Sequence, residues 1–190
     1  MVLLEKFYEN VDVELDGTAL SIRVKEQLDK VVEELPDEEQ FSMPGEIYIG
    51  QQDWIQNILV EKSIDLLTGD PATVSAGDGN IIRGIDCENL GNSWYISTFV
   101  VDSLDKMSDD YTMGLISYKL SEWSYVWKEI TNIPDWNDLG REERIENIGR
   151  LSPSRFPLGN REHEEYERSV DAEVTRLGFE DKLNAYQLRL

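Results

Sequence analysis

The chain of 190 residues contains one cysteine, Cys87, and one histidine, His163. A lone cysteine cannot form an intramolecular disulfide, and one Cys with one His falls short of the ligands of a usual Cys/His zinc site. The spacing leaves a catalytic Cys–His pair open, but no flanking signature supports it. We interpret Cys87 as a small buried strand residue and expect a reducing compartment.

Basic residues are also scarce, since 18 Lys and Arg stand against 39 Asp and Glu and the formal charge is -21. Such a charge repels nucleic acid and anionic membranes, so neither is an expected partner. No run approaches the roughly 20 apolar residues of a membrane span. The opening residues 1–6 do not resemble a leader peptide. We expect a cytoplasmic protein whose acidic surface either keeps it in solution or attracts a basic partner.

Several catalytic signatures are missing as well. The sequence has no G-x-x-x-x-G-K-S/T phosphate loop and no G-x-S-x-G nucleophile elbow. Carboxylates are so abundant that a pair suited to glycoside cleavage carries no information. Five Trp could form a sugar-binding platform, but Trp123 and Trp127 fall on the apolar face of a predicted core helix.

Hydrophobic spacing predicts the elements of the first half of the chain. An amphipathic helix over residues 18–35 ends at Pro36. The other predicted elements are a strand over 46–49, a helix over 53–67 capped by Asp53, a loop over 69–80, and an antiparallel hairpin formed by 81–87 and 94–101.

The second half is predicted to be helical. Ser108 with two following acids is an N-terminal helix signal, and the helix that it opens, through about Ile130, is apolar enough to be the central helix of the core. The other predicted elements are a short charged helix over 138–149, a loop over 152–160, a long helix over 161–177 capped by Gly178, and a short helix or docked tail over 179–190.

Two of these helices together resemble a zinc-peptidase site. The segment Tyr118-Lys119-Leu120-Ser121-Glu122 has the apolar framing of an H-E-x-x-H helix, and Glu167-Arg168-Ser169-Val170-Asp171 has the E-x-x-x-D spacing that completes such a site. Their order and spacing resemble small archaeal and bacterial gluzincins, the minigluzincins. The similar stretches, 94–123 and 164–183, cover about a quarter of the chain.

The resemblance implies a role for each position. Tyr118 stands in the place of the first zinc ligand, Lys119 in that of the general base, Glu122 in that of the second ligand and Glu167 in that of the third, while Asp171 would orient Glu167. Tyrosine is a poor zinc ligand and lysine is a cation, so the resemblance implies a degenerate site without zinc or hydrolysis. Lys119 would form a salt bridge with Glu122 or Glu167.

Plainer interpretations remain open for each of these residues. Tyr118, Lys119 and Glu122 can be ordinary positions of an amphipathic helix, and Glu167 and Asp171 can belong to a solvated acidic face. The lone histidine, His163, can be a surface residue. It can also join Glu122 and Glu167 in a non-standard metal site.

We therefore expect an α+β fold: a single zincin-like domain over residues 1–190, with a helix and sheet part (1–107) and a helical part (108–190). A mostly antiparallel sheet would pack on a backing helix and on the central motif helix. The expected function is that of a catalytically inactive metallopeptidase-like protein, a pseudoenzyme without a cofactor that binds a peptide or protein. The alternatives are a zinc-dependent hydrolase that uses Glu122, His163, Glu167 and Asp171, and an acidic protein that binds a basic partner.

Overall fold

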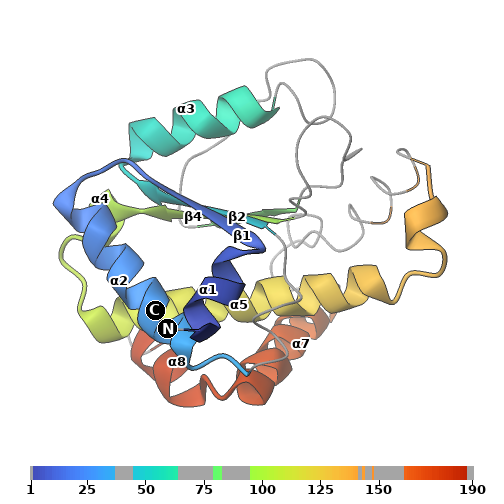
Figure 1. Cartoon of the computed structure of the whole chain (residues 1–190). Helices are drawn as coiled ribbons and strands as arrows, with labels where there is room; N and C mark the ends of the chain where they lie inside the picture. Colours follow the sequence, from blue (N-terminus) through green and yellow to red (C-terminus); the bar gives the residue numbers. More distant parts are fainter. Residues whose placement is uncertain are drawn as a thin grey trace.

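The computed structural model describes residues 2–36, 45–63, 79–82, 95–140, 143, 147 and 161–187 (Figure 1). Helices and strands alternate in its first half, and helices make up its second half. The elements are, in chain order, α1 (Val2–Tyr8), β1 (Val11–Leu15), α2 (Ala19–Glu33), β2 (Gly45–Gly50), α3 (Gln52–Ser63), β3 (Gly79–Ile82), β4 (Tyr95–Val100), α4 (Val101–Leu104), α5 (Asp109–Thr131), the 3-10 helix η3 (Trp136–Asp138), α7 (Arg161–Leu177) and α8 (Glu180–Gln187).

The sheet is mostly parallel, so the expected mostly antiparallel sheet is wrong. Its strand order is β1-β2-β4-β3. β1 pairs with β2 and β2 with β4, both in parallel, while β3 runs antiparallel to β4. The reason lies in α2, which follows β1 and carries the chain back along the sheet, so that β2 enters in the same direction as β1.

The predicted antiparallel pairing is confirmed, because Ile81 of β3 pairs with Ile96 of β4 in antiparallel register. Residues 83–94, which include most of the predicted first strand and the turn of the hairpin, lie outside the described residues. Gly79 and Asn80 belong to β3 and not to the predicted loop. Cys87 lies outside the described residues. The strand β1 was not predicted, although its alternation of apolar and acidic residues is typical of a strand with one buried face.

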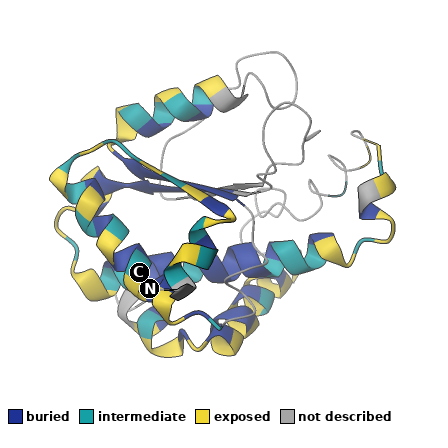
Figure 2. Ribbon diagram, in the orientation of Figure 1, coloured by how far each residue is buried: buried dark blue, intermediate teal, exposed yellow. Residues whose placement is uncertain are grey.

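Helices cover both faces of the sheet. In Figure 1, α3 lies on one face, α2 and α5 lie on the other, and α7 and α8 form a further layer behind α5. Alternate residues of β2 divide between two buried clusters: Ile47 and Ile49 pack with the helices of the larger one, and Tyr48 packs with α3 in the smaller one. Every residue of β2 is buried, as Figure 2 shows, which fits a central parallel strand.

The predicted central helix is confirmed. α5 begins after Ser108, whose hydroxyl accepts a hydrogen bond from the N–H of Tyr111. It is buried along most of its length, with Trp123 fully buried, whereas Trp127 is only half-buried. Residues from the 1–107 part and from the 108–190 part share the larger hydrophobic cluster around this helix.

The helices α2 and α7 also follow the predicted pattern. α2 has Thr18 as its N-cap, which accepts from the N–H of Ser21, and it ends before Pro36. α7 runs over the predicted residues and ends at Gly178, which has the left-handed φ of 77° that favours glycine. The predicted short helix near the C-terminus is α8.

The start of α3 differs from the prediction. The helix begins at Gln52, so Asp53 lies in its first turn and is not its cap. The carboxylates that hold this helix start come from residues that follow other strands. Asp16, after β1, accepts from the N–H of Gln51 at 2.7 Å, and Asp102, in α4 after β4, accepts from the N–H of Gln52 at 2.9 Å. Both acids follow the carboxyl end of a parallel strand, which brings them to one edge of the sheet.

The remaining predictions fall wholly or mostly outside the described residues. They are the end of the helix over 53–67, most of the loop over 69–80, the charged helix over 138–149 and the loop over 152–160.

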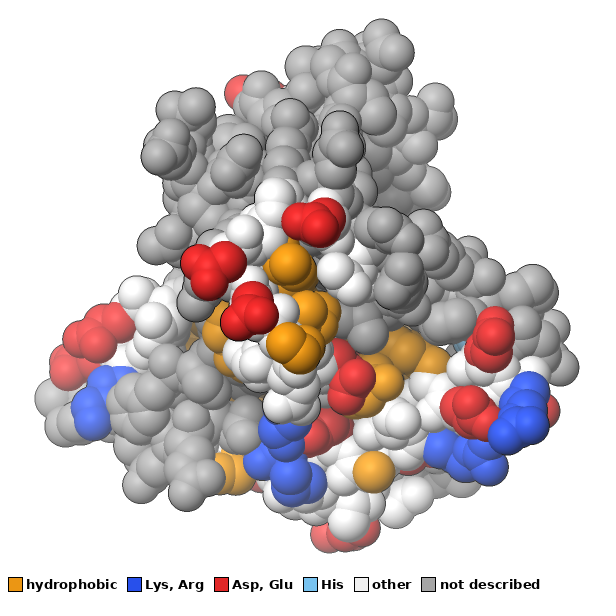
Figure 3. Space-filling view, turned by 90° about the vertical axis from the view of Figure 1, so that its right-hand side faces the viewer, with side chains coloured by type: hydrophobic (Ala, Val, Ile, Leu, Met, Phe, Trp, Pro, Cys, Tyr) orange, Lys and Arg blue, Asp and Glu red, His pale blue; other side chains and the backbone are white. Residues whose placement is uncertain are grey.

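Within the described ranges, no helix is long and apolar enough to cross a membrane. On the face shown in Figure 3, acidic side chains surround a central group of hydrophobic ones, and Lys and Arg side chains gather below them.

Candidate functional site

The candidate site lies between α5 and α7, which pack against each other. Tyr118 and Glu122 are one helical turn apart on α5 and therefore share the side of the helix that faces α7. Lys119, between them, is three residues before Glu122. The side chain of Glu122 is 8% exposed and that of Lys119 is 14% exposed, so both charged groups are largely removed from water.

Glu122 has hydrogen-bonding and ionic partners in this interface. The Tyr166 hydroxyl donates to Glu122 Oε1 at 2.7 Å, and Lys119 Nζ lies 3.6 Å from Glu122 Oε2. The salt bridge that the resemblance implied for Lys119 therefore involves Glu122. Without such partners, burial of a carboxylate would cost several kcal/mol. The same ammonium group also lies 5.8 Å from the centre of the Tyr118 ring.

Tyr166 is a buried, neutral hydrogen-bond donor. Its burial raises the pKa of the phenol far above the usual value, and the negative charge of Glu122, which accepts its hydrogen bond, raises the pKa further. The Tyr125 ring meets the Tyr166 ring edge-on, with their centres 5.4 Å apart. The sequence analysis did not single out Tyr166 and missed this contact with Glu122. A tyrosine at a core position was the available signal, since a buried phenol requires a partner.

The register of α7 turns Glu167 away from Glu122. Tyr166 is buried, whereas Glu167 and Asp171 are exposed, since neighbouring residues of a helix point about 100° apart. The structure thus does not bring Glu167 into the third-ligand position that the resemblance implies, and it agrees with the plainer interpretation of an exposed acidic face. Partial loss of water around the Asp171 carboxyl and the nearby charge of Glu167 both raise the pKa of Asp171.

His163 is mostly buried and is not the surface residue of the plainer interpretation, since its side chain is 15% exposed. Its Nε2 lies 3.1 Å from Glu167 Oε1, one turn along α7. Among the residues that the structure describes, no group of three or more His, Cys, Asp or Glu could hold a metal ion. The non-standard zinc site of Glu122, His163 and Glu167 is therefore not assembled in the structure.

A second buried carboxylate lies in the same interface. Glu173 of α7, only 9% exposed in its side chain, accepts from Lys128 Nζ at 2.5 Å and from Arg176 Nε at 2.5 Å. Arg176 also donates to the Ser124 hydroxyl at 3.0 Å. The sequence analysis did not single out Glu173. The spacing of Glu173 and Arg176, three residues apart on one helix, was the signal for a pair, but it did not indicate burial.

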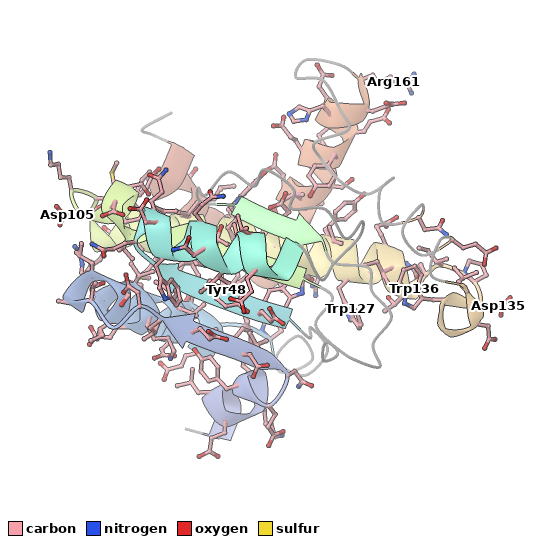
Figure 4. The ribbon with its side chains drawn as sticks, turned by 90° about the horizontal axis from the view of Figure 1, so that it is seen from above. Tyr48, Asp105, Trp127, Asp135, Trp136 and Arg161 are labelled. Atoms are coloured by element: carbon pink, nitrogen blue, oxygen red, sulfur yellow. The ribbon has the colours of Figure 1, made fainter. Side chains whose placement is uncertain are left out.

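The indole side chains give no sugar-binding platform in the described residues. Trp123 is buried in the core, and Figure 4 shows that Trp127 and Trp136 lie toward the far end of α5 and the turn that follows it. Trp136 is itself buried against the larger hydrophobic cluster. These side chains therefore serve packing.

Comparison of the chain with protein-family models, with curated proteins and with solved structures yields no match. The resemblance to gluzincins thus rests on the two motif segments and stays a prediction.

Proposed function

We propose that this chain is a catalytically inactive, metallopeptidase-like protein that binds an extended peptide or protein segment. One observation carries the proposal: buried Glu122 accepts a hydrogen bond from Tyr166 and is paired with Lys119. An ammonium group and a phenol thus surround the carboxylate, where a zinc ion would require further imidazole, thiolate or carboxylate ligands.

The chemistry of these partners supports an inactive site. A zinc peptidase needs a metal-bound water and a carboxylate that takes a proton from it. The position that corresponds to this base carries Lys119, whose ammonium group only donates hydrogen bonds. Tyr166 is held neutral and its hydrogen is directed to Glu122. The network neutralises the carboxylate and leaves it without a role in hydrolysis.

The sheet supports the binding part of the proposal. β3 is the last strand of the described sheet on the side of β4, and it contacts the motif helix α5. An extended peptide can add to such an edge through main-chain hydrogen bonds and then lies beside the helix. The hydrolase alternative has less support, because Glu122, His163 and Glu167 do not converge.

The first test is the metal content of the chain, purified without chelator and measured by inductively coupled plasma mass spectrometry. We expect far less than one transition-metal ion per chain. A near-stoichiometric metal that is lost in Glu122→Gln but retained in Asp105→Asn would overturn the inactive reading. Asp105 is a suitable control, because it is exposed and lies before the start of α5, whereas Glu122 lies in the second half of that helix. Figure 4 shows Asp105 at one end of the molecule.

The second test concerns binding. Linear peptides selected from a displayed random library should bind the full chain equally well with and without a chelator. Hydrogen exchange should then show slower exchange at residues 79–82 in the bound state. Selection without any enriched peptide, or protection that avoids β3 and α5, would contradict binding at this site.

A further inference from the structure

The opposite edge of the sheet, within the described residues, is formed by β1. Asn10 and Asp16 flank this strand. The C=O of Asn10 accepts a hydrogen bond from the N–H of Gly45, and the N–H of Asp16 donates to the C=O of Ile49, so both bond to β2. Successive residues of a strand direct their backbone groups to opposite sides, so the even-numbered residues bond to β2 and the odd-numbered ones point outward. Within the described part of the chain, no hydrogen bond reaches these outward groups, which belong to Val11, Val13 and Leu15.

Two carboxylates stand beside this open edge. The odd-numbered residues of β1 pack on the larger hydrophobic cluster, so Asp12 and Glu14 project to the face that carries α3. Both are exposed, and neither has an ion-pair partner among the described residues. Figure 4 shows α3 over the middle of the sheet and β1 beyond it, which leaves this part of the face uncovered by the helix.

We propose that β1 is a docking edge for an extended, basic segment of a partner protein, with Lys or Arg at alternate positions. The outward N–H and C=O groups supply main-chain hydrogen bonds, and Asp12 and Glu14 pair with the basic side chains that the alternation places on the same face. The formal charge of -21 favours the approach of such a partner.

The same carboxylates disfavour a second copy of this chain as the occupant. If two copies of β1 pair antiparallel with Val13 opposite Val13, Asp12 of each chain lies opposite Glu14 of the other chain. All four carboxylates then lie on one face of the sheet. Like charges directly opposite one another destabilise a strand pair. Only a segment of opposite charge gains from both the backbone and the side chains of this edge.

This inference is independent of the proposed function, because it uses neither β3 nor the cluster of Lys119, Glu122 and Tyr166. The test uses a fluorescent peptide of alternating Lys and Val, about seven residues long to match an ordinary strand. Its binding to the full chain is followed by fluorescence anisotropy. We expect saturable binding that weakens as salt is added.

Two matched controls separate strand addition from general attraction. The variant with Asp12→Lys and Glu14→Lys should bind the peptide about tenfold or more weakly, since two attractions become repulsions. The variant with Glu26→Lys and Glu33→Lys has the same net charge but changes exposed residues of α2, and it should bind almost as the native chain does. The same peptide with every backbone nitrogen methylated keeps its charge but loses the donors that would face the odd-numbered residues of β1 in either strand direction, and it should bind far more weakly.

Three outcomes would overturn the proposal. One is an equal loss of affinity in both charge variants, which would mean attraction to the acidic surface as a whole. Another is equal binding of the N-methylated peptide, which would exclude strand addition. The last is a lack of saturable binding at about 1 mM peptide, where even weak specific contacts are detected. An alternating Glu and Val peptide that binds only the Asp12→Lys, Glu14→Lys variant would add support.

Discussion

At the scale of single residues, the interface of α5 and α7 contains two carboxylates that the protein removes from water. The side chain of Glu122 is 8% exposed and that of Glu173 is 9% exposed. Each has a lysine of α5 as a partner and a hydrogen-bond donor from α7, Tyr166 for Glu122 and Arg176 for Glu173. A buried charge that loses one partner costs more than an exposed one, so these residues are sensitive points of the structure.

The Lys119–Glu122 pair provides the first prediction. Lys119→Met leaves a buried carboxylate with less compensation, and we expect the free energy of unfolding to fall by about 2 kcal/mol. Adding Glu122→Gln to Lys119→Met should recover part of this loss, because the uncompensated charge is removed. Urea unfolding of the native chain, both single variants and the double variant measures the coupling energy.

An exposed pair on α7, the other helix of this interface, serves as the control. Arg161 and Glu165 form an ion pair on α7 with side chains 87% and 51% exposed. The corresponding cycle of Arg161→Met and Glu165→Gln should show no measurable coupling, since water screens such pairs. If the Lys119–Glu122 cycle shows as little coupling, Lys119 does not neutralise the carboxylate.

At the scale of elements, the register of α7 decides which residue meets α5. Position 166 faces Glu122 and position 167 faces solvent. A zinc site designed between the helices should therefore require position 166. We expect a variant with Tyr118→His, Glu122→His and Tyr166→Glu to take up about one zinc per chain, as two His and one Glu suffice for a site with an open position.

The matched control keeps Tyr166 and relies on Glu167, the residue that the resemblance assigns. A variant with only Tyr118→His and Glu122→His should bind zinc much more weakly, because Glu167 points away from the two imidazoles. The visible spectrum of the cobalt-substituted proteins, with zinc competition, gives both affinities. Equal affinities would show that Glu167 reaches the site and that the described register does not limit it.

Asp16 links three elements at one edge of the sheet. It follows β1, and its carboxylate accepts from the N–H and hydroxyl of Thr18 at the start of α2 and from the N–H of Gln51 before α3. Burial alone would raise the pKa of Asp16, but these backbone hydrogen bonds, with hydroxyl bonds from Thr18 and Ser21, hold the pKa below its usual value.

This lowered pKa predicts a pH dependence of stability. A carboxyl whose pKa is lower in the folded state contributes stability above its unfolded pKa and loses it as the pH falls through the folded pKa. The native chain should therefore lose more stability than Asp16→Asn between about pH 5 and pH 2. Urea unfolding across this range measures the difference. Asp105→Asn removes one exposed carboxylate and should keep the native slope, and a native slope in Asp16→Asn as well would contradict the assignment.

At the scale of the whole molecule, charge repulsion opposes the folded state. A formal charge of -21 on 190 residues destabilises the compact chain, and salt screens this repulsion. Raising NaCl from about 10 mM to about 500 mM should raise the melting temperature by about 5 °C. Circular dichroism at both salt concentrations tests this expectation.

A less charged variant provides the comparison for the salt effect. Glu26→Lys with Glu33→Lys changes the charge by two units at each position, from -21 to -17. Its melting temperature should rise less with salt than that of the native chain. A melting temperature that stays constant or falls with added salt in the native chain would mean that attractive pairs, and not net repulsion, dominate its electrostatics.

The sequence by itself determined the helices α2, α3, α5 and α7 and parts of the strands β2, β3 and β4, whereas α1, α4 and β1 were not predicted. The cap Ser108, the stop at Pro36 and the glycine at 178 are local signals, and the structure confirms each of them. Apolar spacing also identified α5 as the buried central helix. These features follow from interactions between residues a few positions apart, which is why a sequence reveals them.

Only the tertiary structure decided the direction of the strands and the partners of the buried charges. The crossover through α2 makes β1 and β2 parallel, and Asp16 and Asp102, from distant segments, hold the start of α3. The choice of Tyr166 over Glu167 depends on the rotation of α7 against α5. Such contacts join residues dozens of positions apart, and their energies depend on how whole elements pack, which no local pattern records.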